Sequence, residues 1–82
     1  MKIISWNVRG LGGFEKRREV CPLVREKKPL VMCIQETKLV TINVQLSQSL
    51  WGGVDVDFSF QPSIGALGGL VTLWDNKEVV VW

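Results

Sequence analysis

Histidine is absent from this 82-residue sequence, and cysteine occurs only twice. Without histidine, the chain has no Ser–His or Cys–His pair, no histidine metal ligand and lacks the commonest general base. Cys21 and Cys33 cannot form the dense disulfide network of small secreted domains. No apolar run approaches the roughly 18 residues that cross a membrane, and the first residues turn polar too early for a signal peptide. These absences predict an intracellular protein, nuclear or cytoplasmic, that is neither secreted nor membrane-spanning.

The composition is that of a small globular domain. Hydrophobic residues make up 46% of the chain and charged residues 22%, as in ordinary folded domains. Positive charge is concentrated near the amino terminus, with seven basic and three acidic residues between Arg9 and Lys28. Such a segment favours phosphate-bearing partners. A solvated helix face with interleaved charges gives the same pattern, and this simpler interpretation carries more weight.

Hydrophobic periodicity predicts a mixture of strands and helices. The predicted strands cover residues 2–8, 30–34, 54–60, 70–74 and 78–82, and the last two form a hairpin. The continuous apolar run at 30–34 is typical of a strand buried on both faces. The predicted helices cover residues 14–28 and 41–50. Pro22 interrupts the first helix, which is therefore either kinked or begins near that residue.

Two of these strands place polar residues at one edge of the sheet. A helical crossover usually makes the strands it joins parallel neighbours, so Asn7 and Glu36 are expected to meet where the two strands end. Ligands bind at this edge in open α/β sheets, and Mg²⁺ prefers carboxylate, water and phosphate oxygens. Lys38 follows Glu36 by two residues, which on an extended chain places both side chains on one side. A capped strand end with a solvated Glu36 explains the same residues equally well.

The sequence motifs around these residues carry a family resemblance. The segment Ser5–Gly10 (SWNVRG) followed by Cys33–Lys38 (CIQETK) resembles the endonuclease/exonuclease/phosphatase superfamily, which includes apurinic/apyrimidinic endonucleases, deoxyribonuclease I and inositol polyphosphate phosphatases. Further details along all 82 residues look most like the amino-terminal endonuclease domain of plant LINE-type (non-LTR) retrotransposons, which accompanies a reverse transcriptase. The resemblance implies the amino-terminal portion of a DNase I-like, four-layered α/β sandwich.

The resemblance assigns roles to individual positions. Glu36 matches the family's metal-binding glutamate, which implies Mg²⁺, or Mn²⁺ in its place, as cofactor and DNA as partner. Asn7 matches the asparagine that helps to position the phosphate and the active-site network, and Lys38 matches a lysine near the metal cluster. Gly68 and Gly69 match a glycine before the next core strand, where they are expected to be packing residues.

The sequence also departs from the family pattern. Arg9 stands where many relatives have an acid, and it is expected to contact the DNA backbone instead. The family's Asp-x-Asn pair, later aspartate and Ser-Asp-His motif are not in this sequence. Because catalytic residues act as a unit, we expect the chain alone to be inactive and to bind metal weakly or not at all. Residues 1–82 are accordingly expected to form one partial domain that lacks its carboxyl-terminal part.

Two other functions fit the sequence. One is a non-catalytic remnant that binds nucleic acid weakly through its basic residues, and the other is an inositol-phosphate phosphatase of the same superfamily. Simple packing explains the remaining candidate residues. We expect three of the four tryptophans, Trp6, Trp51 and Trp74, in the core rather than stacked on bases. Cys21 and Cys33 are expected to be buried, inert thiols.

Overall fold

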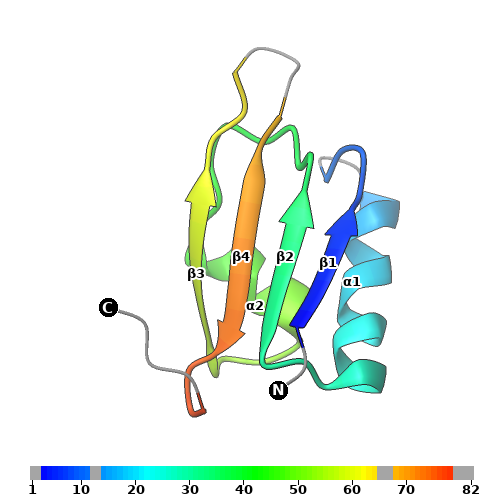
Figure 1. The fold of residues 1–82 in the computed structure, drawn as a ribbon, viewed down its shortest axis with the longest axis vertical. Coiled ribbons are helices and arrows are strands. Elements are labelled where there is room, and N and C mark those ends of the chain that lie inside the picture. Colours follow the sequence, from blue (N-terminus) through cyan, green and yellow to red (C-terminus); the bar gives the residue numbers. More distant parts are fainter. Residues whose placement is uncertain (1–2, 12–13, 65–67, 79–82) are drawn as a thin grey trace.

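A computed structural model of the chain describes residues 3–11, 14–64 and 68–78, which form a mixed four-stranded sheet and two helices (Figure 1). The elements are β1 (Ile3–Asn7), α1 (Phe14–Lys27), β2 (Val31–Gln35), α2 (Val44–Trp51), β3 (Val56–Gln61) and β4 (Leu70–Asp75). The strand order is β1-β2-β4-β3, with β1 and β2 parallel and β4 antiparallel to both of its neighbours. The predicted α/β class and the parallel β1–β2 pair are confirmed.

Helix α1 makes the crossover between the two parallel strands. It runs from Phe14 to Lys27 with Pro22 inside it, so the predicted alternative of a start near Pro22 is wrong. The Pro22 side chain is exposed, which places the ring away from the core. The helix ends where Lys28 turns to a φ of 48° after donating its N–H to the Val24 carbonyl at 2.8 Å. Pro29 follows and prevents further helix.

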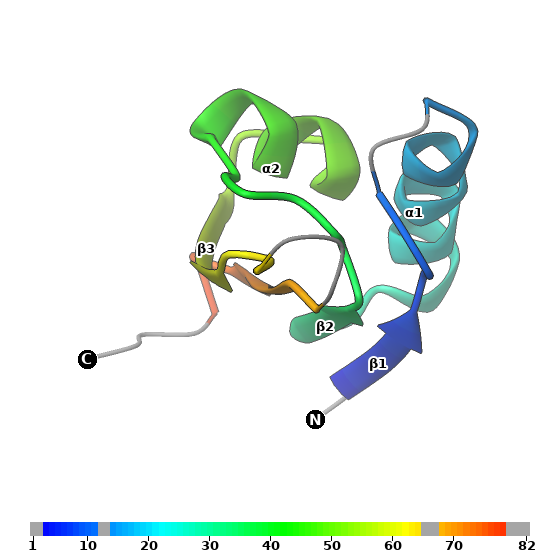
Figure 2. The ribbon, with the colours of Figure 1, turned by 90° about the horizontal axis from the view of Figure 1, so that it is seen from above.

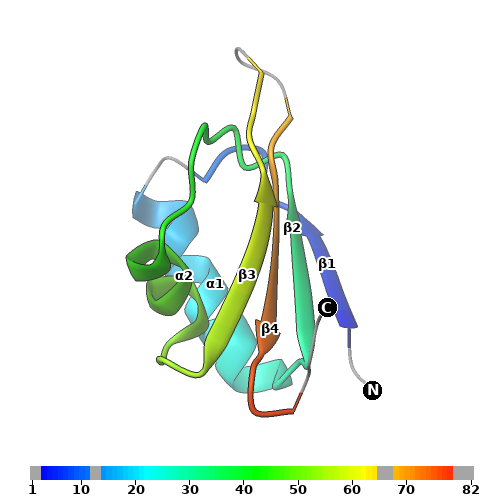
Figure 3. The same cartoon turned by 90° about the vertical axis from the view of Figure 1, so that its left-hand side faces the viewer.

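Strand β2 is covered on one face only, so the predicted burial on both faces is wrong. Met32 and Ile34 are fully buried, whereas Val31 and Cys33 are partly exposed. The reason is the placement of the helices, because α1 and α2 both lie on the same face of the sheet (Figures 2 and 3). A continuous apolar run shows that apolar side chains occupy both faces of the strand. It does not predict which of the two faces the helices cover.

The core lies between this face and the two helices. Its buried members come from every element except β1, and from the loops that follow β1 and β2: Val8, Leu11, Val20, Val24, Met32, Ile34, Ile42, Leu50, Val56, Val71 and Leu73. Trp6 and Trp51 pack against this cluster as predicted. The prediction is wrong for Trp74. It alternates with the buried Leu73, and so lies on the opposite face of β4, partly exposed.

Helix α2 is shorter than predicted because its ends are capped. The Asn43 side chain accepts a hydrogen bond from the Leu46 N–H at 2.8 Å, which starts the helix at Val44 rather than near Thr41. Gly52 ends it in the left-handed conformation, with a φ of 86°, and donates its N–H to the Gln48 carbonyl.

The far end of the sheet differs from the predicted hairpin. Strand β4 pairs with β2 and β3, and Glu78 lies in a turn. Residues 79–82, the rest of the predicted last strand, lie outside the described part of the chain. Cys21 and Cys33 are both free and partly exposed, so their predicted burial is wrong. Neither helix within the described ranges is long and apolar enough to cross a membrane.

Candidate functional site

The ends of β1 and β2 run side by side and continue together into the loops beyond. The Val8 N–H donates to the Gln35 carbonyl at 3.0 Å. Gly10 N–H and Leu11 N–H then donate to the carbonyls of Glu36 and Thr37, both at 2.7 Å. These bonds extend the parallel pairing past the last strand residues, and they fix the chain on either side of Asn7 and Glu36.

The Asn7 and Glu36 side chains meet at this edge. Asn7 Nδ2 donates a hydrogen bond to Glu36 Oε2. The Arg9 backbone N–H donates to Asn7 Oδ1 at 3.1 Å, so the two ends of the amide have different partners. This arrangement fixes which atom of the amide faces Glu36. Asn7 is exposed and Glu36 is partly exposed, so a ligand in solution can reach both.

The backbone at this edge is unusual. Arg9, Glu36 and Lys38 all have positive φ values, of 54°, 56° and 57°. Residues other than glycine rarely occupy this region, and such residues cluster at ligand-binding and active sites. Arg9, Glu36 and Lys38 lie in two neighbouring loops at this edge. Contacts with the surrounding structure are needed to maintain their left-handed backbone conformations.

The expectation that Glu36 and Lys38 lie on an extended stretch of chain is wrong. Because Glu36 and Lys38 both adopt left-handed backbone conformations, the segment turns, and spacing by two residues no longer places their side chains together. The Lys38 N–H donates to the Gly68 carbonyl at 2.9 Å, and its side chain is exposed. The role assigned to Lys38 in a phosphate network stays a prediction.

Gly68 and Gly69 differ in what they do. A Cβ on Gly69 would lie 2.3 Å from Thr37 Oγ1 and 2.9 Å from the Lys38 nitrogen, so the predicted packing role is confirmed for Gly69. A Cβ on Gly68 would meet nothing within 4 Å. Position 68 favours glycine for a different reason: its φ is 76°, a backbone conformation that other residues rarely adopt. Thr37, which is only 1% exposed, was given no role from the sequence, and the CIQETK motif that contains it and the glycine doublet that packs on it are its sequence signals.

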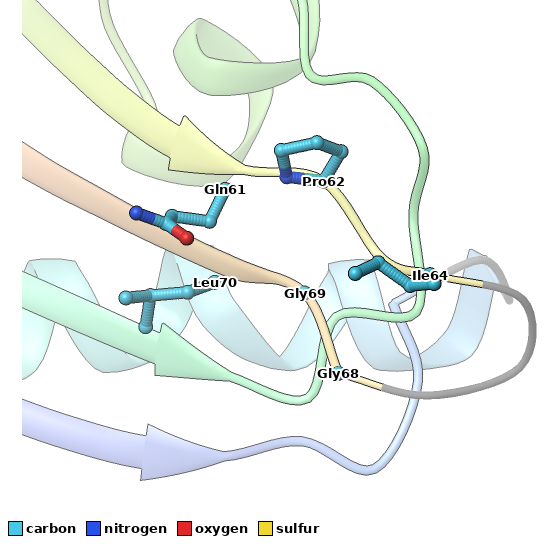
Figure 4. A pocket seen from close by; sticks show the side chains of 6 residues that line it. All are labelled: Gln61, Pro62, Ile64, Gly68, Gly69 and Leu70. Atoms are coloured by element: carbon cyan, nitrogen blue, oxygen red, sulfur yellow. The ribbon is translucent and has the colours of Figure 1, made fainter.

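A pocket lies beside this edge where β3 ends and β4 begins (Figure 4). Its volume is about 470 Å³, and its lining is Gln61, Pro62, Ile64, Gly68, Gly69 and Leu70. None of these side chains can ionise, so the pocket contains no side-chain group for proton transfer or strong metal binding. The chemistry-bearing residues are those of the adjoining Asn7–Glu36 edge.

The charged groups at the site are few. Across the described ranges, no three His, Cys, Asp or Glu residues gather closely enough to hold a metal ion. Glu36 therefore supplies a single carboxylate, which is one ligand of the set that a divalent cation needs.

At the other end of the sheet, Lys77 Nζ lies 3.0 Å from the Asp55 carboxylate. The hydrogen bond to Asp55 and the charge of that residue raise the pKa of Lys77. This exposed pair is separate from the site.

Comparison with solved structures relates this geometry to AP endonucleases. The chain aligns with AP endonuclease LMAP from Leishmania major at 30% identity and a TM-score of 0.69, over 92% of this chain and 24% of that one. It aligns with an AP endonuclease from Archaeoglobus fulgidus at 24% identity and a TM-score of 0.70, over 90% and 27% of the two chains. The APE2 catalytic domain of Xenopus laevis aligns at 23% identity and a TM-score of 0.58, over 92% and 23%.

These alignments establish the fold. The sheet and helices match part of the AP endonuclease, DNase I-like fold, as the sequence resemblance implied. The chain spans about a quarter of the length of the structures that it matches. No protein-family model matches the chain, and no curated protein matches it.

Proposed function

We propose that this chain is part of a Mg²⁺-dependent phosphodiesterase that cleaves DNA, and that Asn7 and Glu36 are its contribution to the active site. The observation that carries the proposal is the hydrogen bond from Asn7 Nδ2 to Glu36 Oε2 at the carboxyl ends of two adjacent parallel strands. This is the edge at which open α/β sheets bind ligands. The similarity to AP endonucleases supports a DNA phosphodiester as the substrate class.

The residues at this edge fit one side of a magnesium site. Asn7 contacts one oxygen of Glu36, and a carboxylate has a second oxygen that can bind a hard cation. When bound, Mg²⁺ would stabilise negative charge on the phosphate and on the leaving oxygen. The part played by this chain is to hold the Glu36 carboxylate in one orientation, because the Asn7 amide is itself fixed by the Arg9 N–H.

Positive charge near the carboxylate suits a phosphate-bearing substrate. Arg9 and Lys38 flank Asn7 and Glu36 in the two loops, and both side chains are exposed. Cations at such a position attract a DNA backbone and contribute salt-dependent affinity. In this proposal Arg9 contacts a DNA phosphate, and Lys38 supports the phosphate network.

The finer identity proposed is the endonuclease domain of a plant LINE-type retrotransposon, acting in the nucleus or cytoplasm. Support comes from the sequence motifs SWNVRG and CIQETK together with the detail between Gly10 and Val20. An inositol-phosphate phosphatase shares the two motifs but is disfavoured by that detail. Tighter binding of an inositol polyphosphate than of a DNA duplex would favour the phosphatase.

We expect the 82-residue chain to lack nuclease activity by itself. It contains no histidine and brings one carboxylate to the site, whereas the catalytic groups of such an enzyme act as a unit. The test is nicking of supercoiled plasmid in the presence of Mg²⁺. Nicking that disappears in Glu36→Gln would contradict this expectation.

Metal binding tests the proposed site without requiring activity. Mn²⁺ added to the ¹⁵N-labelled chain is expected to broaden the amide signals of Gly10, Thr37 and Lys38, which surround Glu36. Glu36→Gln removes the charge while keeping the shape, so the broadening is expected to fall by about tenfold or more. Glu26→Gln, an equally conservative change on the exposed face of α1, serves as the control and should leave the broadening intact.

A different result would favour the non-catalytic remnant. If the chain binds a DNA duplex in a salt-sensitive manner that is unaffected by Mg²⁺ and by Glu36→Gln, then the basic residues alone account for binding. If binding is strengthened by Mg²⁺ and that gain is lost in Glu36→Gln, the proposed function is supported.

A further inference from the structure

Gly68 and Gly69 hold the segment that carries Glu36. The Thr37 N–H donates to the Gly69 carbonyl at 3.1 Å, and the Lys38 N–H donates to the Gly68 carbonyl at 2.9 Å. Both glycines have positive φ values, of 76° and 94°. Two residues just before β4 therefore bond to two residues just past the end of β2, which lie 30 and 32 positions earlier in the sequence.

The same segment is held from its other side by the loop after β1. The carbonyls of Glu36 and Thr37 accept hydrogen bonds from Gly10 and Leu11, both at 2.7 Å. Residues 36–38 thus lie between two backbone partners, one from each neighbouring strand. Glu36 and Lys38 have left-handed backbone conformations, and contacts from outside the segment are needed to maintain them.

Gly69 has no room for a side chain. A Cβ there would lie 2.3 Å from Thr37 Oγ1, 2.9 Å from the Lys38 nitrogen and 3.5 Å from the Leu39 nitrogen. Two of these three atoms are backbone, and Thr37 is buried, so the neighbours cannot rotate away. Any side chain at this position must displace the Thr37–Lys38 backbone, and Glu36 is joined directly to it.

We propose that Gly69 is a positioning residue for the Asn7–Glu36 pair, acting through the Thr37–Lys38 backbone. The absence of a Cβ lets β4 approach closely enough to fix that backbone, which in turn places the Glu36 carboxylate against the Asn7 amide. The expected effect of Gly69 on metal binding rests on the proposed function. The positioning itself can be measured separately.

The test compares three alanine variants of the full chain. Gly69→Ala introduces both left-handed strain and a clash beside the site. Gly68→Ala introduces left-handed strain, with nothing within 4 Å of the new methyl group. Gly52→Ala introduces strain and a clash, 2.8 Å from Cys21 Sγ, in the turn after α2 and away from the site. All three are expected to lower the urea midpoint.

Two readouts report the site apart from stability. The first is the pair of Asn7 side-chain amide proton signals, which we expect the contacts to Glu36 and Arg9 to shift away from random-coil positions. The second is the Mn²⁺ concentration that half-broadens the Gly10 amide. Gly69→Ala is expected to move the Asn7 signals to random-coil positions and to raise that concentration by about tenfold, as outer-shell substitutions do. Gly52→Ala is expected to leave both readouts close to wild type. Gly68→Ala, which strains the residue whose carbonyl accepts from Lys38 but introduces no clash, is expected to change both readouts less than Gly69→Ala does.

Unchanged Asn7 signals and Mn²⁺ response in a folded Gly69→Ala would overturn the proposal, as would equal changes in Gly52→Ala. If Mn²⁺ broadens no wild-type signal, the proposed metal role fails, and the Asn7 signals alone decide the positioning. If Gly69→Ala does not fold, the double variant with Thr37→Ala removes the atom nearest the new methyl. It should bind Mn²⁺ more weakly than Thr37→Ala alone, and equal binding would overturn the proposal.

Discussion

Asn7 has its side-chain amide oriented by two contacts of opposite kind. Its nitrogen donates to the Glu36 carboxylate, and its oxygen accepts from the Arg9 backbone N–H. An amide satisfies both contacts from separate donor and acceptor atoms, whereas a carboxylate cannot donate and an alkyl group can do neither. At the scale of a single residue, the site therefore requires a side chain that both donates and accepts.

Asn7→Asp is expected to destabilise the chain by about 1 kcal/mol at neutral pH, because it replaces an exposed charge-assisted hydrogen bond with repulsion between two carboxylates. The loss should shrink toward about pH 4, where carboxyl groups begin to take up protons. Urea unfolding followed by tryptophan fluorescence at both pH values measures it. Asn43→Asp is the matched control, since aspartate caps a helix as well as asparagine does. Equal losses in both variants would count against the Asn7–Glu36 contact.

The meeting of Asn7 and Glu36 could be predicted because it depends on strand direction alone. Two strands joined by a helix lie parallel, and the residues at their carboxyl ends then come together. The turned backbone at Glu36 and Lys38 could not be predicted in the same way. It depends on the hydrogen bonds from residues 37 and 38 to Gly68 and Gly69, which no local pattern reveals.

Helix α1 tolerates a proline in its interior. Pro22 lies within the unbroken helix Phe14–Lys27, with its side chain exposed. Proline removes one helical hydrogen bond and costs about 3 kcal/mol relative to alanine in a regular helix. The sequence predicted an interruption, but packing of the flanking apolar positions Val20 and Val24 into the core maintains the helix across it.

Pro22→Ala is expected to stabilise the chain by about 1–3 kcal/mol, because it restores a backbone donor and relieves the ring's crowding of the preceding turn. The gain is measured as a rise in the urea midpoint, with an unchanged slope of the unfolding free energy against urea concentration. Ser49→Ala, on the exposed part of α2, changes helix propensity alone and should alter stability by about 0.5 kcal/mol or less. A neutral or destabilising Pro22→Ala would mean that the proline fits the helix without cost.

The whole molecule is a two-layer arrangement in which the helices cover a single face of the sheet. Alternation along the strands was predictable from the sequence, as in β3, where Val56 is buried and Asp57 exposed. The choice of face was not predictable for β2 and β4, because their apolar residues occupy both faces. Only the positions of α1 and α2 in space decide which of them form the core.

Two leucines of β4, Leu70 and Leu73, test this layering. Leu73 is fully buried against the helices, whereas Leu70, on the other face, is 36% exposed. We expect Leu73→Ala to cost about 2–5 kcal/mol and Leu70→Ala about 1 kcal/mol or less. Thermal or urea unfolding of the two variants makes the comparison within one strand. Similar losses for both would mean that the second face is also covered in solution.

The central place of β4 has a consequence for synthesis on the ribosome. Strand β3 pairs with β4 and not with β2, so the β1–β2 pair and β3 share no ladder until residues 70–75 have been made. Synthesis proceeds at about 5–20 residues per second, so Gln35 leaves the ribosome a few seconds before residues 70–75 do, and the edge of β2 that pairs with β4 stays open in between. During that interval the nascent chain presents an unpaired strand to its surroundings. Of the four strands that the structure describes, the last to emerge is the one that joins the two halves of the sheet.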